Sequence, residues 1–167
     1  MIKFLEIKLM IQYKYRVAGV NYQSDRKEKN MTGILIVTHH NLANAFLETI
    51  EMIAGKHEFI DSLGLLPSHD PETFKELILD KVHALKGKGY DEIVVVLDLY
   101  GGTPCNQTIR LLREHQLKVI VGVNLPMMLQ MTLLNTEEHS AEELADTAVE
   151  SGKEGIFDVG KSISKFM

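Results

Sequence analysis

The chain has 167 residues, of which 45% are hydrophobic, and its formal net charge is −5. This length and composition fit one globular domain with a sizeable core, and the negative charge argues against a nucleic-acid binder. Cys105 is the only cysteine, which excludes an intrachain disulfide and predicts a reducing, cytoplasmic location. No apolar run approaches the roughly 18–20 residues that a membrane helix needs.

The first 30 residues differ from the rest of the chain. Charged residues interrupt every apolar stretch there, so no secretory signal is predicted. The charged run 24–30 ends directly before Met31 and is rich in Arg, Lys and Glu, which purine-rich codons encode, as in a translated ribosome-binding site. We therefore predict that residues 1–30 are a leader, an upstream extension before the true start at Met31, and that residues 31–167 form a single domain. The alternative for residues 1–30 is an extra edge strand.

From Met31 onward, apolar β-branched runs alternate with helical patterns. The helices are predicted from apolar residues three or four positions apart and from capping signals such as Asp70-Pro71. In chain order we expect a strand at 33–38, a helix at 41–54, a strand at 59–65, a helix at 70–87, a strand at 93–97, a helix at 106–115 behind a Thr103-Pro104 cap, a strand at 117–123, a Met-rich helix ending at 134 and a helix from the Ser140 capping box to about Gly152.

Strands that alternate with helices predict a parallel sheet with right-handed crossovers. The expected fold is α/β, an open three-layer α/β/α sandwich with a mainly parallel central sheet. A short apolar run at residues 156–159 predicts one further strand at the C-terminus.

Two of the predicted strands end in residues that can do chemistry. His39 and His40 follow the first strand, and Asp98 follows the third, a few residues before the loop Gly101-Gly102. Ligands of open α/β sheets bind outside the carboxyl ends of such strands, so these side chains are expected to meet. On extended backbone the two adjacent histidines would point to opposite sides, which leaves one of them for the site.

Other residue patterns give little evidence for a further functional site. No cofactor is expected, because the chain has no dinucleotide fingerprint, no Walker A sequence and no nucleophile elbow. Cys105 lies near a helix N-terminus, where a thiolate would be stabilised, although a small first-turn residue is the commoner explanation. No metal is expected, because the remaining histidines stand in no ligand pattern and are interpreted as solvated: His57, His69, His83, His115 and His139.

A histidine paired with an aspartate is suited to covalent phosphate chemistry. A carboxylate that accepts a hydrogen bond from one imidazole nitrogen fixes the tautomer and leaves the other nitrogen as a nucleophile. A phosphate on that nitrogen would lie near the amides that open the helix at Asn41 and near those of the Gly101-Gly102 loop. Without a nucleotide motif, this arrangement predicts a carrier of phosphoryl groups rather than a kinase.

Three motifs, at the ends of the first, third and fourth predicted strands, resemble a known family. Residues 37–39 (VTH), 98–104 (DLYGGTP) and 122–127 (GVNLPM) are similar to enzyme IIA of the mannose-type sugar phosphotransferase system, in register from about Met31 to Gly155. The resemblance implies a phosphotransferase in which an active-site histidine takes a phosphoryl group from the phosphocarrier HPr. It passes that group to a histidine of enzyme IIB, and membrane components of the transporter select the sugar.

The resemblance also assigns roles to individual residues. It implies that His39 carries the phosphoryl group, that Asp98 supports it and that Thr103 supplies a hydroxyl in the glycine loop. Thr38, Gly101, Gly102 and Thr103 are the expected phosphate-binding residues. Members of the family are homodimers that exchange a C-terminal strand, which would correspond to residues 156–159.

The sequence departs from the family at two points, and other functions stay open. His40 stands where members commonly have a small residue, and residues 1–30 have no counterpart.

The first alternative function is the phosphotransfer subunit of a dihydroxyacetone kinase system, although the glycine loop of that subunit differs from the one in this chain. A receiver-like module with Asp98 as phosphoacceptor would need an acidic pair where this chain has two histidines. A binding module without chemistry is a further alternative.

Overall fold

The computed structural model describes residues 31–136 and 138–163. The leader predicted at residues 1–30 lies outside this range and stays a prediction. The same holds for the last four residues of the domain predicted at 31–167.

Four parallel strands form the central sheet. They are β1 (Gly33–His39), β2 (Ile60–Leu65), β3 (Ile93–Leu97) and β4 (Lys118–Val121), in the order β2-β1-β3-β4. Every residue of β3 is buried, and so is β1 up to its last residue, which explains why both strands are continuous apolar runs. The prediction of a parallel sheet is confirmed, and the first four predicted strands lie within two residues of their observed bounds.

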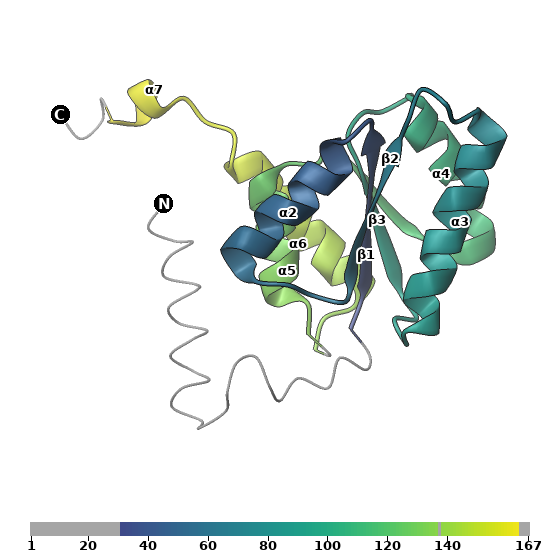
Figure 1. Ribbon diagram of the computed structural model, residues 1–167. Coiled ribbons are helices and arrows are strands. Elements are labelled where there is room, and N and C mark those ends of the chain that lie inside the picture. The colour runs from purple at the N-terminus through teal and green to yellow at the C-terminus, as the bar shows by residue number, and fades with distance from the viewer. Residues whose placement is uncertain (1–30, 137, 164–167) are drawn as a thin grey trace.

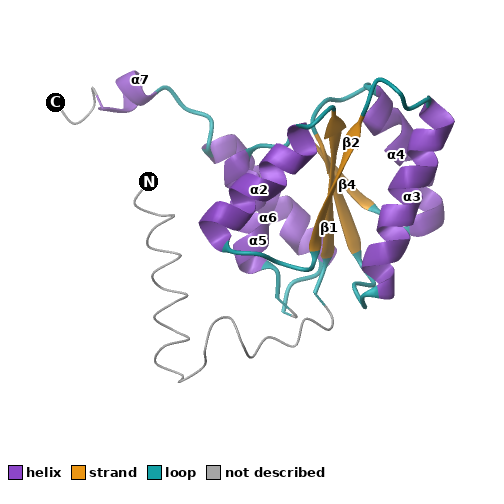
Figure 2. Ribbon diagram, in the orientation of Figure 1, coloured by secondary structure: helices purple, strands orange, loops and turns teal. Residues whose placement is uncertain are grey.

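Helices cover both faces of this sheet. Figures 1 and 2 show α2 (Leu42–Ala54), α5 (Leu125–Leu134) and α6 (Ala141–Glu154) on one face, and α3 (Pro71–Gly87) and α4 (Thr103–His115) on the other. The open three-layer α/β/α architecture is therefore confirmed. None of the helices in the described residues is both long and apolar enough to cross a membrane.

The predicted helix caps are mostly observed. The Asp70 carboxylate accepts from the backbone N–H groups of Glu72 and Thr73, and Ser140 and Glu143 form a reciprocal capping box. The N-cap of α4 is Gly102 and not the predicted Thr103, since Thr103 is already helical. Proline is accepted at either of the first two helical positions, so Pro104 alone does not decide between them.

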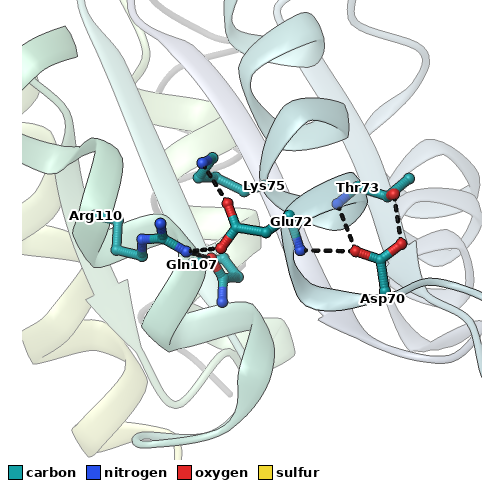
Figure 3. Close-up of polar contacts among 6 residues, drawn as sticks. All are labelled: Asp70, Glu72, Thr73, Lys75, Gln107 and Arg110. Atoms are coloured by element: carbon teal, nitrogen blue, oxygen red, sulfur yellow. Dashed lines mark hydrogen bonds and ion pairs between the residues drawn. The ribbon is translucent and has the colours of Figure 1, made fainter.

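An ion-pair network ties α3 to α4 (Figure 3). The Glu72 carboxylate accepts from Arg110 on α4 and, at 2.6 Å, from Lys75, and Arg110 also donates to the Gln107 side chain at 2.8 Å. Hydrogen bonds from Arg110 and Lys75 lower the pKa of Glu72 to about 2. The two helices on this face are thus joined through exposed polar groups as well as through the core.

A buried asparagine ties the start of β1 to the end of α5. Asn135 accepts from the Thr32 N–H at 3.0 Å and donates to the Thr32 carbonyl at 2.7 Å. Both residues are buried, so these two bonds satisfy backbone groups that water cannot reach. They fix the point at which the chain enters the central strand.

The prediction of a C-terminal strand at Ile156 to Val159 is wrong for the chain as described. Residues 156–158 form no regular element, and α7 (Val159–Ile163) follows. A strand of about four residues needs a sheet edge to pair with, and this segment does not pair with any of the four strands. Ile156 and Phe157 are instead 77% and 61% exposed. Exchange of this segment between subunits stays a prediction.

Candidate active site

The site lies where the chain leaves β1 and β3 in opposite directions. These strands are neighbours in the sheet, yet α2 after β1 packs on one face and α4 after β3 packs on the other (Figure 1). Such a switch point is where open α/β sheets bind ligands, because the two connections part and leave the strand ends uncovered. His39 ends β1 and Asp98 directly follows β3, so the topology brings both to this point.

Asp98 holds His39 by its ring and by its backbone. Asp98 Oδ2 lies 2.8 Å from His39 Nδ1 and accepts from the His39 backbone N–H at 2.9 Å. The other carboxylate oxygen accepts from the Leu99 N–H at 2.8 Å. The structure therefore brings together the two residues that the sequence paired, and it adds two backbone contacts that fix the carboxylate.

The hydrogen bonds keep Asp98 ionised. Its side chain is 14% exposed, and burial alone would raise the pKa of its carboxyl. Hydrogen bonds from the His39 backbone and ring and from Leu99 outweigh this burial, so the pKa of Asp98 lies below its ordinary value. An ionised carboxylate only accepts, so it selects the tautomer with hydrogen on Nδ1 and leaves the lone pair on Nε2. The His39 side chain is 43% exposed, which makes the ring accessible.

The glycine loop packs against the free edge of the His39 ring. A Cβ added to Gly102 would lie 2.7 Å from His39 Cε1 and 3.1 Å from Nε2, so any side chain here would collide with the imidazole. The preceding Gly101 has a φ of 79°, a conformation that favours glycine. The expected phosphate-binding loop therefore does lie beside Nε2, and both glycines are needed for that approach.

The two threonines named from the sequence take different positions. Thr103 is partly exposed and begins α4 directly after Gly102. Thr38 is fully buried, and its hydroxyl donates to the His39 carbonyl at 3.2 Å. Thr38 thus acts on the backbone of His39, whereas Thr103 is placed at the loop that touches the ring. Contact of either hydroxyl with a phosphate stays a prediction.

The backbone turns at His40 instead of continuing in the extended conformation of β1. Its φ is 49°, so the argument from an extended chain was wrong, although the exposed His40 does lie outside the His39–Asp98 pair. The His40 N–H donates to the Leu65 carbonyl at 2.8 Å, and a Cβ on Gly64 would lie 1.9 Å from the His40 carbonyl oxygen. Gly64 was not named from the sequence, but an isolated glycine in a strand is a signal of close backbone approach.

Asn106 is a second residue of the site that the sequence pattern does not identify. Its side-chain amide donates to the Gly101 carbonyl at 2.9 Å, and its backbone N–H donates to the Gly102 carbonyl at 2.9 Å. A polar residue in the first turn of a helix does not by itself predict a contact with the preceding loop, because many such residues are only solvated.

The other candidates lie outside the site. Cys105 is 1% exposed, so its thiol is not accessible to a reaction partner. In the part of the chain that the structure describes, no group of three or more His, Cys, Asp or Glu side chains is placed to hold a metal ion. The remaining histidines are partly or fully exposed, and two of them lie against phenylalanine rings: His57 against Phe59 and His69 against Phe74.

An accessible imidazole oriented by a carboxylate, at the switch point of a parallel sheet, defines a histidine-centred α/β site. Residues 33–149 match the family model described as "PTS system fructose IIA component". The chain belongs to this family, the mannose-type enzyme IIA components of the sugar phosphotransferase system.

Individual relatives agree with this assignment. The chain is 34% identical over 128 residues to the "PTS system mannose-specific EIIAB component" of Escherichia coli (strain K12), covering 74% of this chain and 38% of the relative's length. It is 29% identical over 112 residues to the sorbose-specific EIIA component of Lacticaseibacillus casei, covering 66% of this chain and 78% of that protein. The crystal structure of a phosphotransferase system component EIIA from Streptococcus agalactiae superposes with a TM-score of 0.71 at 30% identity, covering 78% of this chain and 99% of that one.

Proposed function

We propose that the chain carries a phosphoryl group on Nε2 of His39, which it accepts from HPr and passes to a histidine of enzyme IIB. The observation that supports this proposal most strongly is the 2.8 Å contact between Nδ1 and Asp98. That contact occupies one ring nitrogen and leaves the other as the nucleophile on an accessible ring.

The transfer needs only the groups already at the site. The Nε2 lone pair attacks phosphorus, the Nε2–P bond forms, and the bond between phosphorus and the donor histidine breaks. Positive charge then develops on the His39 ring, and the Asp98 carboxylate stabilises it through the hydrogen bond at Nδ1. Passing the group to enzyme IIB reverses these steps. The backbone N–H groups at the start of α4 and the Thr103 hydroxyl are the proposed contacts of the phosphoryl oxygens.

The surroundings of His39 suit contact with a second protein. Exposed apolar side chains occur on three of the connections at this edge of the sheet: Leu42, Leu66, Leu99 and Tyr100. Leu99 and Tyr100 follow Asp98 directly and are 61% and 78% exposed. Transfer between two proteins must bring the partner's histidine to Nε2, so the partner has to cover these residues. HPr and enzyme IIB would use the same surface in turn.

The matching relatives bear on the alternatives. Their names refer to sugar phosphotransferase systems, which favours this role over the phosphotransfer subunit of a dihydroxyacetone kinase system. The homodimer, the cytoplasmic location and the participation of membrane components in sugar selection stay predictions.

Phosphorylation from phosphoenolpyruvate through enzyme I and HPr tests the proposal. The wild-type protein is expected to become labelled, the His40→Gln variant to be labelled equally, and the His39→Gln variant to stay unlabelled. Adding enzyme IIB should then remove the label from the wild-type protein. An unlabelled wild-type protein, or a labelled His39→Gln variant, would overturn the assignment.

A further inference from the structure

Asn106 holds both carbonyl groups of the glycine loop. Its side-chain amide donates to the Gly101 carbonyl, and its backbone N–H donates to the Gly102 carbonyl, each at 2.9 Å. The side chain can reach back in this way because side chains on a helix point toward its N-terminus. Asn106 is exposed, so the bond from its side chain does not serve to satisfy a buried group.

Fixing these carbonyls also fixes the N–H groups on the other side of each peptide unit. The described chain contains no cis peptide bond, and in a trans peptide the N–H points opposite to the C=O of the preceding residue. Since both carbonyls are directed to Asn106, the N–H groups of Gly102 and Thr103 are directed away from it. Neither N–H has an acceptor within α4, because the cap and the first helical residues lack one.

The same loop touches the nucleophilic edge of His39. A Cβ on Gly102 would lie 3.1 Å from Nε2, so the peptide units on both sides of Gly102 border the place where a phosphoryl group would be attached. Glycine permits peptide rotations that other residues do not, and Gly101 already has a φ of 79°. If the peptide between Gly101 and Gly102 were rotated, it would present a carbonyl oxygen instead of an N–H, and that oxygen would repel a phosphate.

We infer that Asn106 is a positioning residue, whose amide holds the Gly101–Gly102 peptide so that the Gly102 N–H donates to the phosphoryl group on His39 beside the Thr103 N–H. The inference rests on the proposed function, since it concerns the phosphorylated form of His39. Asn106 does not touch the reacting atoms. It acts through the loop, as a fixed pair of N–H donors is effective only when it is oriented before the charge arrives.

Two variants separate this role from a general effect on the helix. Asn106→Ala removes the donor, and Asn106→Asp keeps the shape but replaces the amide with a carboxylate. A negative charge in the first turns of a helix is stabilising, so the aspartate variant should stay folded, as circular dichroism can verify. We expect both variants to accept phosphate from phosphorylated HPr about 10- to 100-fold more slowly than the wild-type protein. Glu114→Ala, at an exposed position near the other end of α4, is the control and should keep the wild-type rate.

Amide spectra supply a readout that helix stability alone would not change. On phosphorylation, the 1H–15N resonance of Gly102 should shift downfield in the wild-type protein and in Glu114→Ala, and much less in Asn106→Ala. The Thr103 resonance should shift in all three proteins, because the backbone N–H of residue 106 still holds the Gly102 carbonyl in the alanine variant. Wild-type rates in Asn106→Ala, or a slow variant that keeps the full Gly102 shift, would overturn the inference. A wild-type protein that takes no phosphate on His39 would overturn the proposed function itself, and this outcome is visible before any variant is compared.

Discussion

At the scale of single residues, the Asp98 carboxylate organises the candidate site. It receives the ring of His39, the backbone N–H of His39 and the backbone N–H of Leu99. Oδ2 contacts both the ring and the backbone of His39, and the Leu99 N–H holds the other oxygen, so the carboxylate that orients the imidazole is itself fixed by two backbone groups. This arrangement predicts that changes at Asp98 affect chemistry more than folding.

Asp98→Asn is expected to leave the protein folded and to slow phosphoryl transfer from HPr by about 100-fold. The amide keeps the size of the carboxylate, but it is neutral and cannot stabilise a positively charged imidazole. Stopped-flow or quench-flow transfer assays measure this rate. Asp80→Asn, an exposed position on α3, is the matched control. An unchanged rate in Asp98→Asn would remove Asp98 from the mechanism.

His40 stands in a conformation that costs free energy. A side chain at a φ of 49° brings Cβ close to the following carbonyl, and glycine avoids that contact. We expect His40→Gly to raise the free energy of unfolding by up to about 1 kcal/mol, since part of the gain is offset by the greater entropy of the unfolded chain. His83→Gly, an exposed position within α3, should lower it by about 1 kcal/mol.

Urea unfolding of both variants checks this difference in sign. A lower free energy of unfolding in His40→Gly would show that a contact of the imidazole stabilises the fold by more than the backbone conformation at His40 costs. Acceptance of phosphate should be unchanged in this variant, because the chemistry is placed on His39.

The sequence was informative where chemistry and strand ends coincide. The pairing of His39 with Asp98 could be predicted because parallel strands end at one edge of the sheet. The roles of Gly64 and Asn106 could not, because each depends on how one backbone segment approaches another. Thr38 shows the same limit: its place beside His39 was visible, but its burial and its bond to the His39 carbonyl were not.

At the scale of elements, α3 and α4 are joined by the ion pairs of Glu72 (Figure 3). The pKa of Glu72 is lowered to about 2, chiefly by the hydrogen bond from Arg110 and then by the one from Lys75. A carboxyl with a depressed pKa in the folded state stabilises the fold above its unfolded pKa of about 4.3, and this stability is lost as the pH falls toward 2. Because Glu72 and Arg110 are 60% and 49% exposed, water and salt weaken the effect.

Glu72→Gln should therefore unfold at a lower temperature than the wild-type protein at pH 7 and low salt, with a difference that narrows at pH 3 and in high salt. Thermal unfolding by circular dichroism measures the difference under each condition. Glu76→Gln, also exposed on α3, serves as the control for removal of a charge. A difference that does not change with pH would show that Glu72 acts through packing and not through its charge.

The elements could be predicted where local signals agreed. Ile93–Leu97 was found with its observed bounds, because a buried β-branched run is bounded by polar residues on both sides. The start of α4 was misplaced because Gly102, without a side chain, caps it through the backbone bond from Asn106 to its carbonyl. The strand expected at residues 156–159 follows from apolar, β-branched composition, but a strand also needs a partner edge, which composition does not reveal.

At the scale of the whole molecule, the segment after α6 presents apolar side chains outside the core. Ile156, Phe157 and Val159 are more than half exposed. Neighbouring exposed apolar residues are typical of contact surfaces. Together with the predicted exchange of a C-terminal segment, they lead us to expect a homodimer that depends on this segment.

Deleting residues 155–167 should convert a dimer to a monomer in multi-angle light scattering, and Phe157→Ser should weaken the dimer. Met52→Ser, at a 79% exposed position on α2, is the control and should not change the mass. A monomeric full-length protein would contradict the predicted dimer.

The central claim is that Asp98 occupies Nδ1 and so directs phosphorylation to Nε2 of His39. Long-range 1H–15N NMR of the protein phosphorylated by phosphoenolpyruvate, enzyme I and HPr identifies the nitrogen that carries phosphorus. We predict phosphorus on Nε2 of His39, in a bond that is stable in base and labile in acid. Phosphorus on Nδ1 or on His40, or a base-labile acyl phosphate on Asp98, would contradict this account.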